Sequence, residues 1–100
     1  MKFVAVTACP TGIAHTYMAA EQLEKTAKKL GHTIKVETQG AMGIENELSQ
    51  ADIDAAEAAI FAADIAIEQA ERFDRIRKIQ VPVQAALKDP AAIFQKAQAA

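Results

Sequence analysis

The single cysteine of the chain, Cys9, lies in a segment whose residue types suit phosphate chemistry. An apolar run, residues 3–6, precedes it, and an amphipathic run, residues 17–30, follows it. A strand that ends in a short loop opening a helix directs backbone N–H groups at one small volume, which favours negative charge. Such a volume can activate a thiol and can hold a phosphate. Cys9 is therefore the first candidate for a reactive group.

The residues after Cys9 suit such a loop. Pro10 fixes one φ angle and offers no N–H, and Gly12 lets the backbone approach a ligand closely. Threonine hydroxyls add further hydrogen-bond donors around the same volume. The sequence predicts a phosphate-binding loop formed by Pro10, Thr11, Gly12, Ile13, Ala14, His15 and Thr16.

The spacing from Cys9 to His15 matches a known phosphate-binding frame. Five residues separate the two, and Thr16 follows, as in the cysteine phosphatase loop C-x5-R-[S/T] with histidine in the place of arginine. Arginine grips a phosphate through a permanently charged bidentate fork, which histidine cannot form. The loop is expected to hold a phosphoryl group on sulfur without the clamp that phosphatases use for hydrolysis.

A longer block carries a resemblance to a known family. Residues 7–21, TACPTGIAHTYMAAE, and residues 36–40, VETQG, resemble the fructose-type enzyme IIB of the bacterial phosphoenolpyruvate-dependent sugar phosphotransferase system. Similarity at residues 47–48, 62–64 and 71–73 extends it over nearly the whole chain, so residues 1–100 are expected to form a single enzyme IIB domain. The resemblance implies a cytoplasmic phosphotransferase that needs no cofactor or metal.

The resemblance also implies the partners. Cys9 would accept a phosphoryl group from a phosphohistidine on enzyme IIA and pass it to a fructose-like sugar that enters through the membrane enzyme IIC. The sugar itself cannot be chosen from this chain, because sugar choice belongs to the membrane component.

Several roles stay open at this stage. His15 either caps the first helical turn or donates to phosphoryl oxygens. A second group of residues either lines the site or only shapes the backbone, namely Thr7, Thr38, Gln39 and Gly40. A low-molecular-weight phosphatase is an alternative, since it shares the strand–loop–helix arrangement, the C-x5 frame and an Asp-Pro pair, here residues 89–90. It carries arginine where this chain has His15. A thiol redox enzyme would need a second cysteine, which this chain lacks. A non-catalytic interaction domain is a further alternative, and it would not use Cys9.

Composition narrows the class of protein. A chain of 100 residues has room for one core, and its net charge of −2 argues against a nucleic-acid binder that relies on phosphate contacts. No apolar run approaches the roughly 20 residues of a membrane-spanning helix, and no leader is visible. One cysteine cannot form an internal disulfide, which fits a reducing cytoplasm. The acidic residues lack His or Cys at ligand spacing and are expected to be solvated, namely Glu45, Glu47, Asp52, Asp54 and Glu57.

The pattern of elements predicts an α/β fold. Continuous apolar runs at residues 2–7 and 59–63 indicate central strands, and alternating runs at residues 33–38 and 79–83 indicate edge strands. Helices are expected at residues 13–30, with Ala20, Leu23, Ala27 and Leu30 facing inward, at residues 50–57 after a Ser49–Asp52 capping box, and after Asp89-Pro90. Residues 39–43 are expected to form a loop, and residues 68–76 a short helix or irregular segment.

Such alternation predicts a three-layer α/β/α domain. We expect a four-stranded parallel sheet of order 2-1-3-4 with helices on both faces. Ligands bind outside the carboxyl ends of such strands where the winding reverses, which is between strands 1 and 3. The Cys9 loop is expected to emerge there.

Overall fold

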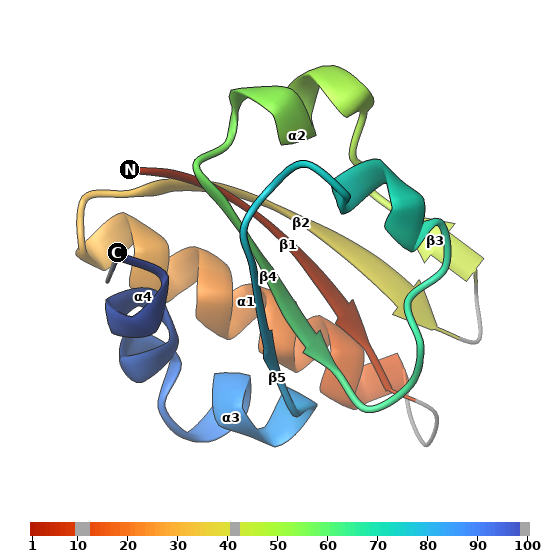
Figure 1. Cartoon of the computed structure of the whole chain (residues 1–100). Coiled ribbons are helices and arrows are strands. Elements are labelled where there is room, and N and C mark those ends of the chain that lie inside the picture. The colour runs from red at the N-terminus through yellow and green to blue at the C-terminus, as the bar shows by residue number, and fades with distance from the viewer. Residues whose placement is uncertain (10–12, 41–42, 99–100) are drawn as a thin grey trace.

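The computed structural model describes residues 1–9, 13–40 and 43–98 (Figure 1). The strands are β1 (Lys2–Ala8), β2 (Thr33–Gly40), β3 (Gly43–Glu45), β4 (Ala58–Ala63) and β5 (Lys78–Val81). The helices are α1 (Ile13–Lys29), α2 (Gln50–Ala55), α3 (Val83–Lys88) and α4 (Pro90–Gln98), and a 3-10 turn, η1 (Ala70–Phe73), lies between β4 and β5.

The sheet is mixed and has five strands in the order β3-β2-β1-β4-β5. β1 pairs in parallel with β2 and β4, β4 pairs in parallel with β5, and β3 pairs antiparallel with β2. The prediction of a purely parallel sheet of four strands was therefore wrong, although the four parallel strands have the expected relative order. β3 was missed because three residues are too few to show alternation. Gln39 and Gly40, expected in a loop, extend β2 instead.

Helices cover both faces of the sheet, as predicted. In Figure 1, α1, α3 and α4 lie on one face, and α2 and the teal segment that contains η1 lie on the other. The larger core lies on the first face and includes Phe3, Leu23 and Phe94. The smaller core, on the α2 face, includes Val6 and Phe73. Each such side chain, when fully buried, contributes roughly 1.5–3 kcal/mol relative to an exposed one.

α1 begins at Ile13 and ends close to the predicted residue. Gly31 follows it with φ of +81°, and the N–H of His32 donates to the carbonyl of Ala27 at 2.8 Å, which closes the helix as a glycine C-cap does. Three of the four residues expected to face inward are buried, namely Ala20, Leu23 and Ala27. Leu30 is 44% exposed and the prediction for it was wrong, because it lies beyond the last helical residue, where the chain turns away.

The carboxyl-terminal third contains one element that the sequence pattern concealed. The predicted strand over residues 79–83 ends at Val81, and Pro82 is the N-cap of α3. Val83 begins that helix and is buried together with Ala86, at the three-residue spacing of a helix rather than the two-residue spacing of a strand.

The other two predicted helix starts are confirmed as well. Ser49 and Asp52 form a reciprocal capping box at the start of α2. The Asp89 carboxylate accepts the N–H of Ala92 at 3.3 Å where α4 begins.

Candidate functional site

Cys9 directly follows β1 at the carboxyl edge of the sheet. Its side chain is 7% exposed and belongs to the core between the sheet and α1. β1 is flanked by β2 on one side and β4 on the other, so the strand order reverses where Cys9 leaves the sheet. Pro10, Thr11 and Gly12 lie outside the described residues, and α1 begins at Ile13. A thiol is thus placed at the end of a central strand, shortly before the N-terminus of a 17-residue helix, where negative charge is favoured.

Three buried threonines lie beneath this point. The Thr7 hydroxyl donates to the backbone carbonyl of Thr16 at 3.1 Å, which ties the end of β1 to the first turns of α1. Thr7 and Thr38 are register partners in neighbouring parallel strands, so their side chains leave the sheet on the same face. The Thr16 and Thr38 hydroxyls are buried and make no hydrogen bond within the described part of the chain. A buried hydroxyl without a partner costs about 1–3 kcal/mol, so these two are available to a ligand or a water.

The exposed side of the site is formed by α1. Ala14 and His15 are exposed on its first turn, and no hydrogen bond or ion pair joins the His15 side chain to another of the described residues. Tyr17 is 40% exposed, and its hydroxyl donates to the Glu45 carboxylate on β3. The hydrogen bond joins the first helix to the antiparallel strand that the sequence pattern did not reveal.

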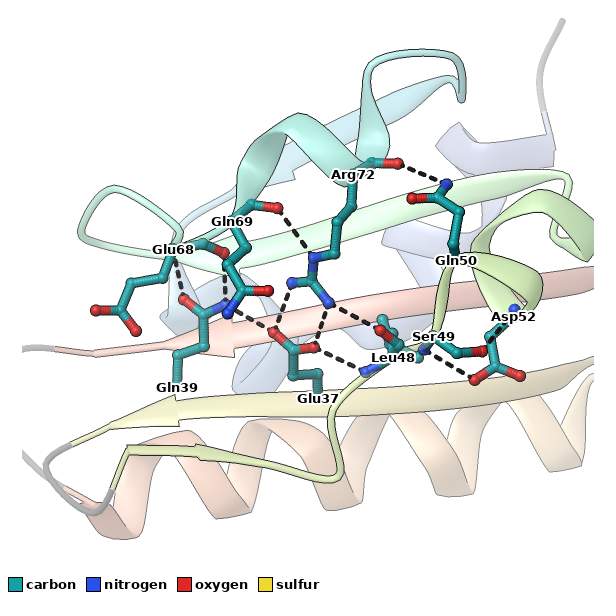
Figure 2. A network of polar contacts seen from close by, with 9 residues as sticks. All are labelled: Glu37, Gln39, Leu48, Ser49, Gln50, Asp52, Glu68, Gln69 and Arg72. Atoms are coloured by element: carbon teal, nitrogen blue, oxygen red, sulfur yellow. Dashed lines mark hydrogen bonds and ion pairs between the residues drawn. The ribbon is translucent and has the colours of Figure 1, made fainter.

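The three candidates on β2 have different surroundings. Thr38 faces α1, whereas Gln39 faces the opposite side of the sheet and is buried there. The Gln39 amide nitrogen donates to the Glu37 carboxylate at 2.7 Å and to the Glu68 carbonyl at 3.0 Å, and its oxygen accepts the Glu68 N–H at 2.8 Å (Figure 2). Gly40 pairs with Gly43 of β3. Gln39 therefore braces the backbone on the η1 side, and Thr38 is the member of this group on the same face as Thr7.

A buried ion pair beside Gln39 was not predicted. The guanidinium of Arg72 donates from Nη1 to Oε1 of Glu37 at 2.9 Å and from Nη2 to Oε2 at 3.0 Å, and the N–H of Leu48 donates to Oε1 at 2.8 Å (Figure 2). The Glu37 side chain is fully buried and that of Arg72 is 11% exposed. Burial alone would raise the pKa of Glu37, but the hydrogen bonds from Arg72, Leu48 and Gln39 outweigh it and hold this pKa below 4.5. Glu37 is therefore ionised at neutral pH.

The sequence carried one signal for this pair. Glu37 and Arg72 both belong to blocks on which the family resemblance rests, but they stand 35 positions apart, and no local pattern pairs residues at that distance.

In the part of the chain that the structure describes, the acidic residues do not gather into a cation site. Within residues 1–9, 13–40 and 43–98, no group of three or more His, Cys, Asp or Glu side chains is arranged to hold a metal ion. Asp52 instead accepts from Lys35 at 2.8 Å and from the N–H of Ser49 at 3.2 Å. Among the helices of the described residues, none is both long enough and apolar enough to span a membrane.

Comparison with known proteins decides the family. Residues 4–96 match the family model described as the lactose/cellobiose-specific IIB subunit of the PTS system. The chain belongs to the enzyme IIB family of the sugar phosphotransferase system. The fructose-like EIIB component 2 of Escherichia coli (strain K12) is 49% identical over 98 residues, which cover 98% of this chain and 92% of that protein.

Two further relatives are similar to nearly the whole of this chain. The 2-O-α-mannosyl-D-glycerate-specific EIIABC component of Escherichia coli (strain K12) is 52% identical over 94% of this chain, which spans only 14% of that longer protein. The crystal structure of a domain of the fructose-specific IIABC component of Borrelia burgdorferi is 45% identical, with a TM-score of 0.91 over 96% of this chain and 91% of that one. The predicted resemblance to fructose-type enzyme IIB is confirmed.

Proposed function

We propose that this enzyme IIB domain, residues 1–100, carries a phosphoryl group on Cys9. The observation that carries the proposal is the position of the thiol. It stands where the strand order reverses, shortly before the N-terminus of α1, above two buried threonine hydroxyls that have no partner among the described residues. This arrangement supplies a nucleophile, a volume that favours negative charge, and unused donors for oxygen atoms.

The proposed chemistry is two in-line phosphoryl transfers. The Cys9 thiolate attacks the phosphorus of a phosphohistidine on enzyme IIA, the P–N bond breaks, and the electron pair stays on the imidazole. A hydroxyl of the sugar at the membrane enzyme IIC then attacks the same phosphorus, the S–P bond breaks, and the thiolate is restored while the hydroxyl proton is released. Backbone N–H groups of residues 11–15 and the Thr16 hydroxyl would hold the equatorial oxygens. Position and charge of this kind are most of what phosphoryl transfer requires.

The histidine at position 15 supports transfer to a sugar rather than to water. His15 lies exposed on the first turn of α1, and it lacks the permanently charged fork that an arginine would bring to the transferring oxygens. The aspartate of the Asp-Pro pair, which a phosphatase would use as an acid, caps α4 through Ala92 in this fold. A phosphocysteine in such a site would persist until the sugar and enzyme IIC arrive.

The acceptor is proposed to be a fructose-like sugar on the cytoplasmic side of the membrane. Two relatives that are about half identical to this chain are described as a fructose-like component and as a component specific for 2-O-α-mannosyl-D-glycerate. The chemistry at Cys9 is common to these sugars, because the reacting group is a hydroxyl in each case.

Mass spectrometry tests the proposal directly. The protein is incubated with phosphoenolpyruvate, the general phosphotransferase proteins and a fructose-type enzyme IIA. We expect one phosphate on Cys9, none in Cys9→Ser, and loss of the phosphate when enzyme IIC membranes and fructose are added. Steady hydrolysis of an aryl phosphate without a lasting phosphocysteine would refute the proposal and favour a phosphatase.

A further inference from the structure

The segment between β4 and η1 crosses the carboxyl edge of the sheet beside Cys9. The N–H of Asp64 donates to the carbonyl of Ala8 at 3.0 Å, and Ala8 is the residue directly before Cys9. Four residues later, Glu68 makes backbone hydrogen bonds to the Gln39 side chain on β2. Because β1 lies between β4 and β2, residues 64–68 pass over the end of the strand that carries Cys9. We call this stretch, residues 64–68, the crossing segment.

Both ends of the crossing segment are anchored by side chains. At its start, the Asp64 carboxylate accepts the N–H of Val83 at 3.2 Å, the first residue of α3. At its end, the Gln39 carboxamide pairs with both the N–H and the carbonyl of Glu68, at 2.8 and 3.0 Å, as a neighbouring strand would (Figure 2). A single amide side chain thus satisfies two backbone groups that lie 29 positions away along the chain.

The orientation of the Gln39 amide is itself determined by the buried ion pair. Its nitrogen also donates to Glu37 at 2.7 Å, and a carboxylate can only accept, so the amide oxygen must point to the Glu68 N–H. Glu37 is in turn held by Arg72, whose Nε and Nη1 donate to the carbonyls of Gln69 and Leu48 at 3.0 and 2.9 Å. The pair has no net charge, so it orients Gln39 without placing a net charge under the site.

We infer that Gln39 is a positioning residue of the Cys9 site. Gln39 holds the crossing segment against Ala8 and thereby fixes the orientation of the peptide between Ala8 and Cys9. The inference rests on the proposed function for its kinetic consequence only, because the positioning itself is a property of the backbone. Without the amide, the Glu68 N–H and carbonyl lose their partners, and the Asp64–Ala8 hydrogen bond loses the support of the far end of the segment. A displacement of about 1 Å at a reacting group can lower a rate by about a hundredfold.

Gln39→Met tests the inference, because methionine matches the length of glutamine and carries no amide. The matched control is Gln50→Met. Gln50 also donates to the backbone of this region, to the carbonyl of Arg72 at 3.1 Å, but from the exposed side of α2. We measure the rate of Cys9 phosphorylation by phospho-IIA, and amide hydrogen exchange at Asp64 and Glu68.

For Gln39→Met we expect exchange at Glu68 and at Asp64 to rise by about tenfold or more, while exchange in β1 and β4 stays at the wild-type rate. The maximal rate of phosphorylation should fall by about tenfold or more, with little change in the IIA concentration that gives half the maximal rate. Gln50→Met should remain within about twofold of wild type in both measurements.

Two outcomes overturn the inference. The first is fast exchange at Glu68 with wild-type exchange at Asp64 and a wild-type rate of phosphorylation, since the crossing segment would then not transmit the change to Cys9. The second is an equal rise of exchange in β1 and β4, which would make Gln39 a residue of general stability. If the wild-type protein is not phosphorylated at all, the proposed function fails, and exchange at Asp64 still decides whether Gln39 positions the segment.

Discussion

Replacing Arg72 by methionine removes the cation of the buried ion pair and keeps an unbranched apolar side chain in place of the arginine stem. Glu37 accepts four hydrogen bonds, two from Arg72, one from the Leu48 N–H and one from Gln39, and its side chain is fully buried. Arg72→Met leaves two of these four bonds and no counter-charge. The carbonyls of Leu48 and Gln69 lose a donor as well.

The size of the effect follows from this burial. Breaking a buried ion pair by removing one partner costs about 3–5 kcal/mol, because the remaining charge stays buried without compensation. A domain of this size has a free energy of unfolding of about 5–15 kcal/mol, so Arg72→Met should remove a large part of it. With a urea m-value of about 2 kcal/mol per molar, a loss of about 4 kcal/mol lowers the unfolding midpoint by about 2 M.

Urea unfolding at pH 7 is the assay, and Lys25→Met is the matched control. Lys25 pairs with Glu21 at 2.9 Å, but both side chains are more than 60% exposed. A helix-surface pair of this kind contributes about 0.3–0.5 kcal/mol. Lys25→Met should therefore shift the midpoint by a few tenths of a molar at most.

The pH dependence separates a charge effect from lost packing. In the wild type the pKa of Glu37 lies below 4.5, so its contribution to stability is present above pH 4.5 and is lost as the pH falls through the lower folded value. In Arg72→Met, the hydrogen bonds and the positive charge of Arg72 no longer lower this pKa, so we expect it to rise and the variant to lose most stability at neutral pH, where Glu37 is ionised. The difference in stability between the two proteins should narrow from pH 7 to pH 4. A difference that stays constant over this range, or a loss no larger than that of Lys25→Met, would refute the electrostatic argument.

Two further predictions concern single side chains. Thr16→Val removes a buried hydroxyl that has no partner among the described residues, so we expect the unfolding free energy to stay equal or to rise by up to about 1 kcal/mol. Phosphorylation of Cys9 should slow by about tenfold, because the hydroxyl is proposed to hold a phosphoryl oxygen. A slower rate together with a loss of stability of the same size would contradict this. The hydrogen bond from Lys35, and then those of Ser49, lower the pKa of Asp52 from 3.8 to about 2, so its contribution to stability is present above pH 3.8 and disappears towards pH 2. Asp52→Asn should flatten the stability profile in that window, and an unchanged acid unfolding curve would show that the pairing with Lys35 contributes nothing.

Much of the fold was readable because the signals are local. The apolar runs at β1 and β4, the capping box at Ser49 and the glycine that ends α1 all depend on residues within a few positions of one another. The same holds for Cys9, whose place between a strand and a helix follows from the residues on either side.

The errors fall where the deciding contact is distant. The three residues of β3 show no alternation of their own, and they form a strand because they pair with the backbone of β2. Val83 fits the alternation of the strand before it, and burial together with Ala86 makes it helical instead. The error at Leu30 is different, because its cause is local: Leu30 fits the inward face of α1, but the helix ends at Lys29 and the turn at Gly31 leaves Leu30 exposed.

The sequence by itself determined the family, the α/β class, the order of the parallel strands and the position of Cys9, because these depend on motifs and periodicities within short stretches. Only the tertiary structure decided that Thr38 faces α1 while Gln39 faces η1, and that Glu37 meets Arg72 beside Gln39. Strand register and long-range packing set which face a side chain takes and which charge it meets, and neither is written in the neighbouring residues.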